Sequence, residues 1–243
     1  MEKLDAFWES RNLDKAVLEL TFDKNDRNIK IIEDLKEENH DYIVAKVPIR
    51  NIELIHQLEE EGFRFMETQF SLVKKIKEDN IIPSQLKSLS SKLNWEPVVT
   101  HTHLDEVLKK IDENLFETDR IALDPYFNIK IANKRYQNWI LDQFHKDDYE
   151  VYEIIFRGKK VGFFFIKLES SIVSILLAGI YREFREYGLG FSIIYTPLKL
   201  SLLTEKKIAK TRVSSNNLEV LRLYQTFGYM INDVEYVFRK FIE

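Results

Sequence analysis

Three of the seven glycines in this chain, Gly179, Gly188 and Gly190, fall within one stretch of twelve residues. Glycine is costly in regular structure, so the cluster indicates backbone that turns tightly or approaches a ligand closely. Residues 185–190 join a strand-like segment to a helix-like one, and a helix start presents unpaired N–H groups and a positive dipole end. Such a loop can bind a phosphate group. The alternative is a tight strand-to-helix turn without a ligand.

Two common phosphate-binding motifs do not fit this loop. No Gly-Lys-Ser/Thr sequence follows the glycines, which excludes a P-loop. Segments 149–157, 160–168 and 171–180 resemble strands joined by tight turns, so we expect them to be antiparallel. Antiparallel strands before the loop disfavour a dinucleotide-binding fold.

The composition is that of an ordinary globular protein. The chain has 243 residues, of which 44% are hydrophobic and 31% charged, enough for one large domain or two small ones. A net charge of −4 argues against bulk nucleic-acid binding. The absence of cysteine excludes disulfides, thiolate nucleophiles and cysteine-ligated zinc. No apolar run suits a signal peptide or a membrane span, so we expect a cytoplasmic protein.

The first third of the chain is predicted to have the order β-α-β-α-β. We expect this smaller N-terminal domain to occupy residues 1–77. A polar stretch with Pro83 and several serines, residues 78–94, is predicted to link it to a second domain. The expected strands of the first domain are 16–22, 42–47 and 63–76, and the expected helices are 26–39 and 52–61.

The second domain, residues 95–243, is predicted to have the order β-α-α-β-β-β-α-β-α-β. Thr102, with Asp105 three residues later, is a plausible N-cap for its first helix. Besides the three antiparallel segments above, the expected strands are 96–101, 208–213 and 233–242, and the expected helices are 102–116, 130–145, 189–205 and 217–227.

An internal repeat connects the two parts. Shifting residues 51–76 by 166 positions lays them on residues 217–242 without a gap, and Gly62 meets Gly228. The match reflects either a related origin or a generic amphipathic pattern. Leu58 stands where the second copy has Tyr224, and no glycine loop precedes the first copy. We therefore place the active site in the second domain.

Two motifs resemble those of the GCN5-related N-acetyltransferases (GNAT). Arg185-x-x-Gly188-x-Gly190 resembles the Arg/Gln-x-x-Gly-x-Gly/Ala motif, whose loop holds the pyrophosphate of acetyl-CoA. Asn217, Tyr224 and Gly228-Tyr229 are similar to the second signature, Asn-x6-Tyr-x3-Gly-aromatic. The resemblance implies an α/β (α+β) GNAT fold, with a central, mixed, mostly antiparallel sheet flanked by helices. The smaller first domain then resembles a degenerate GNAT half.

The resemblance implies acetyl-CoA as co-substrate and no metal. Acyl transfer needs an attacking amine, stabilisation of an oxyanion and a proton for the thiolate. Tyr224 is the candidate general acid; its alternative role is that of a buried aromatic residue. Asn217 either bonds the cofactor or caps its own helix. The implied cofactor-binding residues are Leu177, Ala178, Gly179, Ile180, Arg185, Glu186, Tyr187, Gly188, Leu189, Gly190 and Asn217.

The loop departs from the family pattern at Glu186 and Tyr187, where glycine and a basic residue are usual. A carboxylate beside a pyrophosphate is unfavourable unless it points away. The general base stays open among Asp119, Asp124 and a water chain, because residues 171–178 contain no acid or histidine.

A narrower resemblance concerns the acceptor. The residues that carry it are Phe116, Asp119-Arg120, Asp124-Pro125, Phe127, Tyr136 and Trp139-Ile140. This segment is similar to the acceptor-side segment of the dTDP-fucosamine acetyltransferase type, which acetylates the 4-amino group of a nucleotide-linked deoxysugar. It implies acceptor contacts from Arg120, Asp124 and Tyr126; otherwise these residues cap and pack helices. Other readings are a peptide, lysine or polyamine acceptor, or a non-catalytic acyl-CoA sensor.

Two further features concern metals and partners. His101 and His103 would share a face on a strand, but no third ligand stands at a metal-binding spacing. We expect no metal. The expected partner is a small-molecule amine. The last strand could pair with a second copy in a homodimer, through a segment rich in Tyr236, Val237, Phe238 and Phe241.

Overall fold

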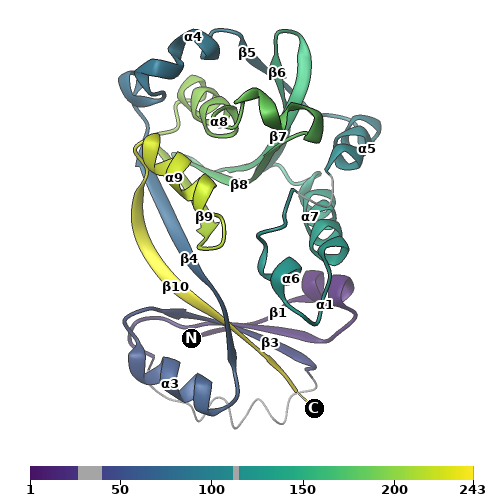
Figure 1. Cartoon of the computed structure of the whole chain (residues 1–243), viewed down its shortest axis with the longest axis vertical. Helices are drawn as coiled ribbons and strands as arrows, with labels where there is room; N and C mark the ends of the chain where they lie inside the picture. Colours follow the sequence, from purple (N-terminus) through teal and green to yellow (C-terminus); the bar gives the residue numbers. More distant parts are fainter. Residues whose placement is uncertain (27–39, 112–114, 243) are drawn as a thin grey trace.

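The computed structural model describes residues 1–26, 40–111 and 115–242, and these form one ten-stranded sheet (Figure 1). Its strand order is β1-β2-β3-β10-β4-β9-β8-β7-β6-β5. The strands are β1 (Glu2–Asp5), β2 (Val17–Thr21), β3 (Tyr42–Pro48), β4 (Arg64–Lys75), β5 (Leu93–Pro97), β6 (Tyr149–Phe156), β7 (Lys159–Leu168), β8 (Ile172–Ile180), β9 (Ile208–Ser214) and β10 (Met230–Phe241).

Helices cover both faces of this sheet. They are α1 (Phe7–Leu13), α3 (Ile52–Glu60), α4 (Lys87–Ser90), α5 (His101–Lys110), α6 (Arg120–Leu123), α7 (Ile129–Gln143), α8 (Ser192–Leu203) and α9 (Leu218–Thr226), with 3-10 turns η1 (Glu78–Asn80), η2 (Ser84–Leu86) and η3 (Arg182–Tyr187). Only β2 with β3 and β8 with β9 pair in parallel; the other described pairs are antiparallel. The mixed, mostly antiparallel sheet confirms the predicted fold class.

The core that surrounds the site lies on both sides of the sheet at β6 to β8, and further clusters lie around β2, β3 and β10. Apolar residues of α8 and α9, such as Ile194, Leu198 and Leu221, pack with Ile154 and Phe164 on one face. Those of α5 and α7 pack on the other, where the buried residues include Leu104, Ile140 and Phe163. Burial of such side chains is the main stabilising term of the fold. No helix of the described residues has the length and apolar character needed to cross a membrane.

The repeat is visible in the structure as well as in the sequence. The bounds of β3, α3 and β4 differ from those of β9, α9 and β10 by 166 residues at both ends. The two copies also exchange their last strands. Strand β10 pairs with β3, as Phe241 opposite Tyr42, while β4 pairs with β9 in the equivalent register, as Lys75 opposite Ile208. The shared element bounds and shared register support a related origin of the two copies.

This exchange has two consequences. Strand β10 from the predicted second domain lies between β3 and β4 of the predicted first domain, so one sheet runs through both (Figure 1). Both edges of β10 are therefore hydrogen-bonded within the chain. The prediction that this strand pairs with a second copy is wrong, because its backbone groups are already used.

Several predicted boundaries also differ. Strand β1 and helix α1 were not predicted; the residues of β1 are all exposed, so they show no alternating apolar pattern. Residues 101–103, predicted to end a strand and begin a helix, all lie in α5. Thr100, and not Thr102, is the N-cap: its hydroxyl accepts a hydrogen bond from the His103 N–H at 3.2 Å. The helix predicted over residues 26–39 falls, apart from its first residue, outside the described residues.

Candidate active site

Strands β8 and β9 separate partway along their length. Their parallel pairing runs from Ile172 opposite Ile208 to Ile175 opposite Thr211, and β8 then continues to Ile180 without β9 beside it. A β-bulge lies at this point, because Phe165 pairs with Leu177 and Ile166 with Ile175. Leu176 is the extra residue, and a bulge of this kind bends and twists its strand. Residues 176–180 thus present main-chain groups to the gap between the strands.

The first copy of the repeat lacks such a gap. Strand β2 pairs with β3 along its whole length, up to Thr21 opposite Lys46. The Phe22 N–H then donates to the Lys46 carbonyl at 2.9 Å, so the pairing continues beyond the strand. This geometry agrees with placing the site in the second copy.

The glycine loop lies directly beyond β8. Turn η3 ends at Gly188, which has φ of +68°, a left-handed conformation that favours glycine. Within the described residues, the amides of Leu189, Gly190 and Phe191 have no main-chain acceptor before α8 begins at Ser192. These three amides and the helix start form an arrangement that can bind an anion.

The side chains of the loop are placed differently from one another. Arg185 folds back, and its Nε donates to the Ile180 carbonyl at 3.3 Å, which ties the loop to the end of β8. Glu186 and Tyr187 are exposed. The two residues that depart from the family pattern are therefore on the surface of the turn.

Tyr224 lies on α9 and faces the same region. Its side chain is only 3% exposed, and its hydroxyl contacts that of Thr211, which donates to the Ile175 carbonyl at 2.9 Å. Thr211 and Ile175 form the last pair before the strands separate. Burial raises the pKa of Tyr224 to about 12, so the phenol keeps its proton at neutral pH. Asn217 caps α9, with its Oδ1 accepting from the Val220 N–H at 3.2 Å.

A cavity of about 440 Å³ extends from this gap toward the first copy of the repeat. Leu177, Ala178, Asn217 and Tyr224 line one part of it. Leu115 also lines it and covers Gly179, where an added Cβ would lie 2.6 Å from Leu115 Cδ1. Side chains from α1, β2, β3 and β4 line the opposite part. The N-terminal part of the chain thus completes the cavity.

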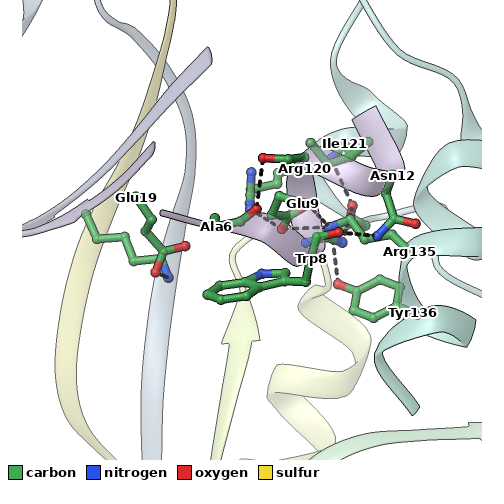
Figure 2. Close-up of polar contacts among 12 residues, drawn as sticks. Ala6, Trp8, Glu9, Asn12, Glu19, Arg120, Ile121, Arg135 and Tyr136 are labelled. Atoms are coloured by element: carbon green, nitrogen blue, oxygen red, sulfur yellow. Dashed lines mark hydrogen bonds and ion pairs between the residues drawn. The ribbon is translucent and has the colours of Figure 1, made fainter. Parts of the chain in front are cut away.

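A buried ionic cluster forms the wall of the cavity where the N-terminal part of the chain meets the second copy of the repeat (Figure 2). Glu9 on α1 accepts hydrogen bonds from Arg135 Nε at 2.7 and 2.8 Å and from Arg120 Nη2 at 3.2 Å. Asp119 accepts from Arg135 Nη1 at 3.3 Å and from the Tyr136 hydroxyl at 2.5 Å. Burial alone would raise the pKa of both carboxyls, but Arg135 and Arg120 outweigh it and lower the pKa of each. Both carboxylates are ionised at neutral pH.

The three predicted acceptor residues are not brought together. Arg120 lines the cavity, whereas Asp124 and Tyr126 do not. Asp124 is buried and accepts a hydrogen bond from Arg239 Nε at 3.1 Å. Tyr126 is 68% exposed and packs on Phe241, with the ring centroids 4.6 Å apart. The environments of Asp124 and Tyr126 indicate roles in holding α6 against β10.

Several residues that line the cavity were not predicted, and Glu67 is one of them. Glu67 on β4 lines the cavity and is 4% exposed, and its carboxylate contacts the Ser214 side chain. Burial raises the pKa of this carboxyl. The one local signal for Glu67 is an acidic residue at an inward-facing position of a strand. That signal does not link a residue of the first domain to a site in the second.

Glu96, His103 and Glu153 bring three potential metal ligands within 4.8 Å of one another. Two lysines already occupy this cluster: Lys160 lies 2.5 Å from Glu153 and 2.6 Å from Glu96, and Lys110 lies 3.0 Å from Glu153. Ammonium groups at ligand distance disfavour a cation. The cluster is best described as an ion-pair network around the buried Glu153, to which the Tyr181 hydroxyl also donates.

The chain has the GNAT fold, as its structural neighbours show. A functionally unknown conserved protein from Staphylococcus epidermidis ATCC 12228 matches with a TM-score of 0.64 and 16% identity, over 97% of this chain and 89% of that chain. A GCN5-related N-acetyltransferase from Sphaerobacter thermophilus matches with a TM-score of 0.58 and 11% identity, over 82% of this chain and 59% of that chain. A tandem GNAT protein from the clavulanic acid biosynthesis pathway matches with a TM-score of 0.55 and 10% identity, over 93% of this chain and 75% of that chain. No family model and no curated protein matches the sequence.

Proposed function

We propose that this protein transfers the acetyl group of acetyl-CoA to the amine of a small acceptor. The observation that carries the proposal is the gap between β8 and β9, which has unpaired amides at one end and the Tyr224 hydroxyl at its branch point. A diphosphate suits the amides of Leu189, Gly190 and Phe191, and an extended amide-containing arm suits the open edge of β8. Acetyl-CoA has both parts.

Each part of the site has a proposed role. When bound, acetyl-CoA supplies an activated thioester. The amides of Leu189, Gly190 and Phe191 hold the pyrophosphate, with Arg185 keeping the loop against the end of β8. Main-chain groups of residues 177–180 orient the arm, and Asn217 fixes the start of α9. Tyr224 holds a proton at its hydroxyl oxygen and gives it to the departing sulfur.

The acceptor we propose to test first is a nucleotide-linked 4-amino deoxysugar. Support comes from the segment that resembles the dTDP-fucosamine acetyltransferase type, because Phe116, Arg120, Tyr136 and Trp139 of that segment line the cavity. A polyamine or a lysine side chain is the alternative. Most cations of the cavity wall are already paired with carboxylates, which favours an acceptor that brings a positive charge.

The experiment combines binding and turnover. Coenzyme A at 100 times its Kd is expected to raise the Tm by about 5–10 °C. Thiol release from acetyl-CoA is then followed with dTDP-linked amino sugars, spermidine and lysine peptides. Release that depends on one amine class supports the proposal and identifies the acceptor. Stabilisation without turnover on any amine would favour an acyl-CoA sensor. The absence of both stabilisation and turnover would overturn the proposal.

A further inference from the structure

We propose that Glu67, which β4 supplies from the first copy of the repeat, is the general base that takes a proton from the acceptor amine. This inference rests on the proposed function and adds the proton acceptor to it. From the sequence, the base stays open between Asp119, Asp124 and a water chain.

The position of Glu67 follows from the pairing of β4 with β9. Gln69 lies opposite Ser214, and the Ser215 N–H donates to the Thr68 carbonyl at 2.7 Å. The Thr68 N–H donates in turn to Ser215 Oγ at 3.1 Å. These bonds fix β4 against the segment that leads into α9. Glu67 and Tyr224 therefore line one cavity, so that a proton acceptor and a proton donor share it.

The charge environment separates Glu67 from the other carboxylates of the cavity. Within the described residues, Glu67 forms no ion pair with a lysine or arginine, and the polar side chain in contact with it is that of Ser214. The other three carboxylates are neutralised: Glu9 by Arg120 and Arg135, Asp119 by Arg135 with Tyr136, and Glu19 by Lys46. A base needs a free lone pair and a pKa near the working pH, and Glu67 meets both conditions better than these three.

The charges around Glu67 come from several elements. Arg120 and Arg135 lower its pKa and Asp119 raises it, while burial has the largest effect and raises it. The Glu19–Lys46 pair from β2 and β3 and the half-exposed Arg212 from β9 also line the cavity. A cationic amine that approaches Glu67 would neutralise the negative charge of this buried carboxylate. Glu67 would then both bind the ammonium group and accept its proton.

Glu67 also has a place in the repeat. Its counterpart 166 residues later is Asp233, which is exposed and does not line the cavity. The counterpart of Tyr224 is Leu58, which is buried in the core of the first copy. The proposed base and the proposed acid thus come from different copies. Each copy keeps one of the two groups, so the chain builds one site and not two.

The protons balance in the following way. The acceptor binds as R–NH3⁺ and gives one proton to the Glu67 carboxylate, which later releases it to solvent. The neutral nitrogen forms a bond to the acetyl carbon and the carbon–sulfur bond breaks. Tyr224 gives its proton to the departing sulfur and recovers one from the nitrogen. The products are the amide, coenzyme A as a thiol and one released proton.

The test uses two amines of similar size. At pH 7 ethylamine is almost entirely protonated, as lysine is, whereas 2,2,2-trifluoroethylamine is mostly neutral. Only the protonated amine needs a base before it attacks. We expect Glu67→Gln to lower thiol release from acetyl-CoA by about 100-fold or more with ethylamine and by less than about 10-fold with trifluoroethylamine. The ethylamine deficit should shrink as the pH rises toward about 10.

Glu235→Gln is the matched control. Glu235 is a buried carboxylate on the neighbouring strand and does not line the cavity. This variant should keep both rates within a few-fold, and both variants should keep the Tm increase given by coenzyme A. An equal loss on the two amines, or no loss, would overturn the role of Glu67. The proposed function fails separately, when the wild-type protein shows neither a Tm increase with coenzyme A nor thiol release with any amine of the acceptor screen. Where the screen identifies an acceptor, the pH dependence of its thiol release in Glu67→Gln and Glu235→Gln tests Glu67 in the same way, and equal profiles for the two variants would overturn its role.

Discussion

Glu9 and Arg135, 126 residues apart in the sequence, form a buried ion pair in which Nε lies 2.7 and 2.8 Å from the two carboxylate oxygens. Glu9 belongs to α1 at the start of the chain, and Arg135 belongs to α7 beside the cavity (Figure 2). The pair joins the N-terminal part of the chain to the wall on which we place the acceptor. The geometry of that wall therefore depends on α1.

Glu9→Gln is expected to destabilise the fold. The change removes the main counter-charge of the buried Arg120 and one of the two carboxylates that face Arg135, and breaking a buried pair costs about 3–5 kcal/mol. Urea unfolding measures the loss. The matched control is Asp142→Asn, which breaks the exposed ion pair with Arg11 and should cost under about 1 kcal/mol. Similar losses for the two variants would contradict the importance of the buried cluster.

Tyr224→Phe is expected to slow acetyl transfer by about 100-fold or more while coenzyme A binds as before. The change removes the hydroxyl proton and keeps the ring that packs in the core. Steady-state kinetics with the acceptor from the screen, together with a thermal shift by coenzyme A, separates the two effects. An unchanged turnover would remove the assignment of Tyr224 as general acid.

Tyr229→Phe is the control for that change. Tyr229 is buried, its ring centroid lies 4.8 Å from that of Tyr224, and among the described residues its hydroxyl has no hydrogen-bond partner. Removing an unpaired buried hydroxyl should leave turnover within a few-fold and stability unchanged or slightly higher.

Gly188→Ala is expected to weaken the binding of coenzyme A. The left-handed backbone at φ of +68° costs a residue with a Cβ about 1 kcal/mol, so the loop would relax and move its amides. We expect an increase in Kd of about 5-fold or more by calorimetry. Gly158→Ala carries the same strain at φ of +78° in the β6–β7 turn, with open space around it as at Gly188. It should lower stability similarly and leave Kd unchanged; equal Kd values for the two variants would contradict the role of the loop.

Glu153 predicts a loss of stability in acid. Burial alone would raise its pKa, but hydrogen bonds from His103, Lys160, Tyr181 and Lys110 lower it from 4.5 to about 2. A carboxyl with a lowered native pKa stabilises the fold above pH 4.5, and this contribution is lost as the pH falls from 4.5 toward about 2. The shift corresponds to about 3 kcal/mol as an upper bound.

The measurement is the free energy of unfolding of wild type and Glu153→Gln as a function of pH. The variant should be less stable at pH 7, since Lys110 and Lys160 lose their buried counter-charge, and its stability should fall less between pH 4.5 and 2. Parallel pH profiles for the two proteins would show that protonation of Glu153 does not cause the loss of stability in acid.

The regular elements of the second domain were largely predictable because their signals are local. Residues 149–180 alternate or run apolar between short polar turns, and the structure has strands β6, β7 and β8 there. The match between α3-β4 and α9-β10 was also visible as a shift of 166 residues. Strand β1 was not predictable, because an exposed edge strand needs no apolar pattern. The start of α5 was missed because Thr100 and Thr102 offer the same capping group two residues apart.

The sequence by itself determined the loop and its glycines, the caps and the amphipathic elements, because these depend on residues close together in the chain. The tertiary structure decided which distant residues meet. Strand exchange between the copies brings Glu67 beside Ser214, and the docking of α1 brings Glu9 to Arg135. Both contacts join residues more than a hundred positions apart, and a local sequence pattern cannot predict a contact over such a separation. The physical reason is that long-range pairing is selected by the burial of the whole sheet and not by any one segment.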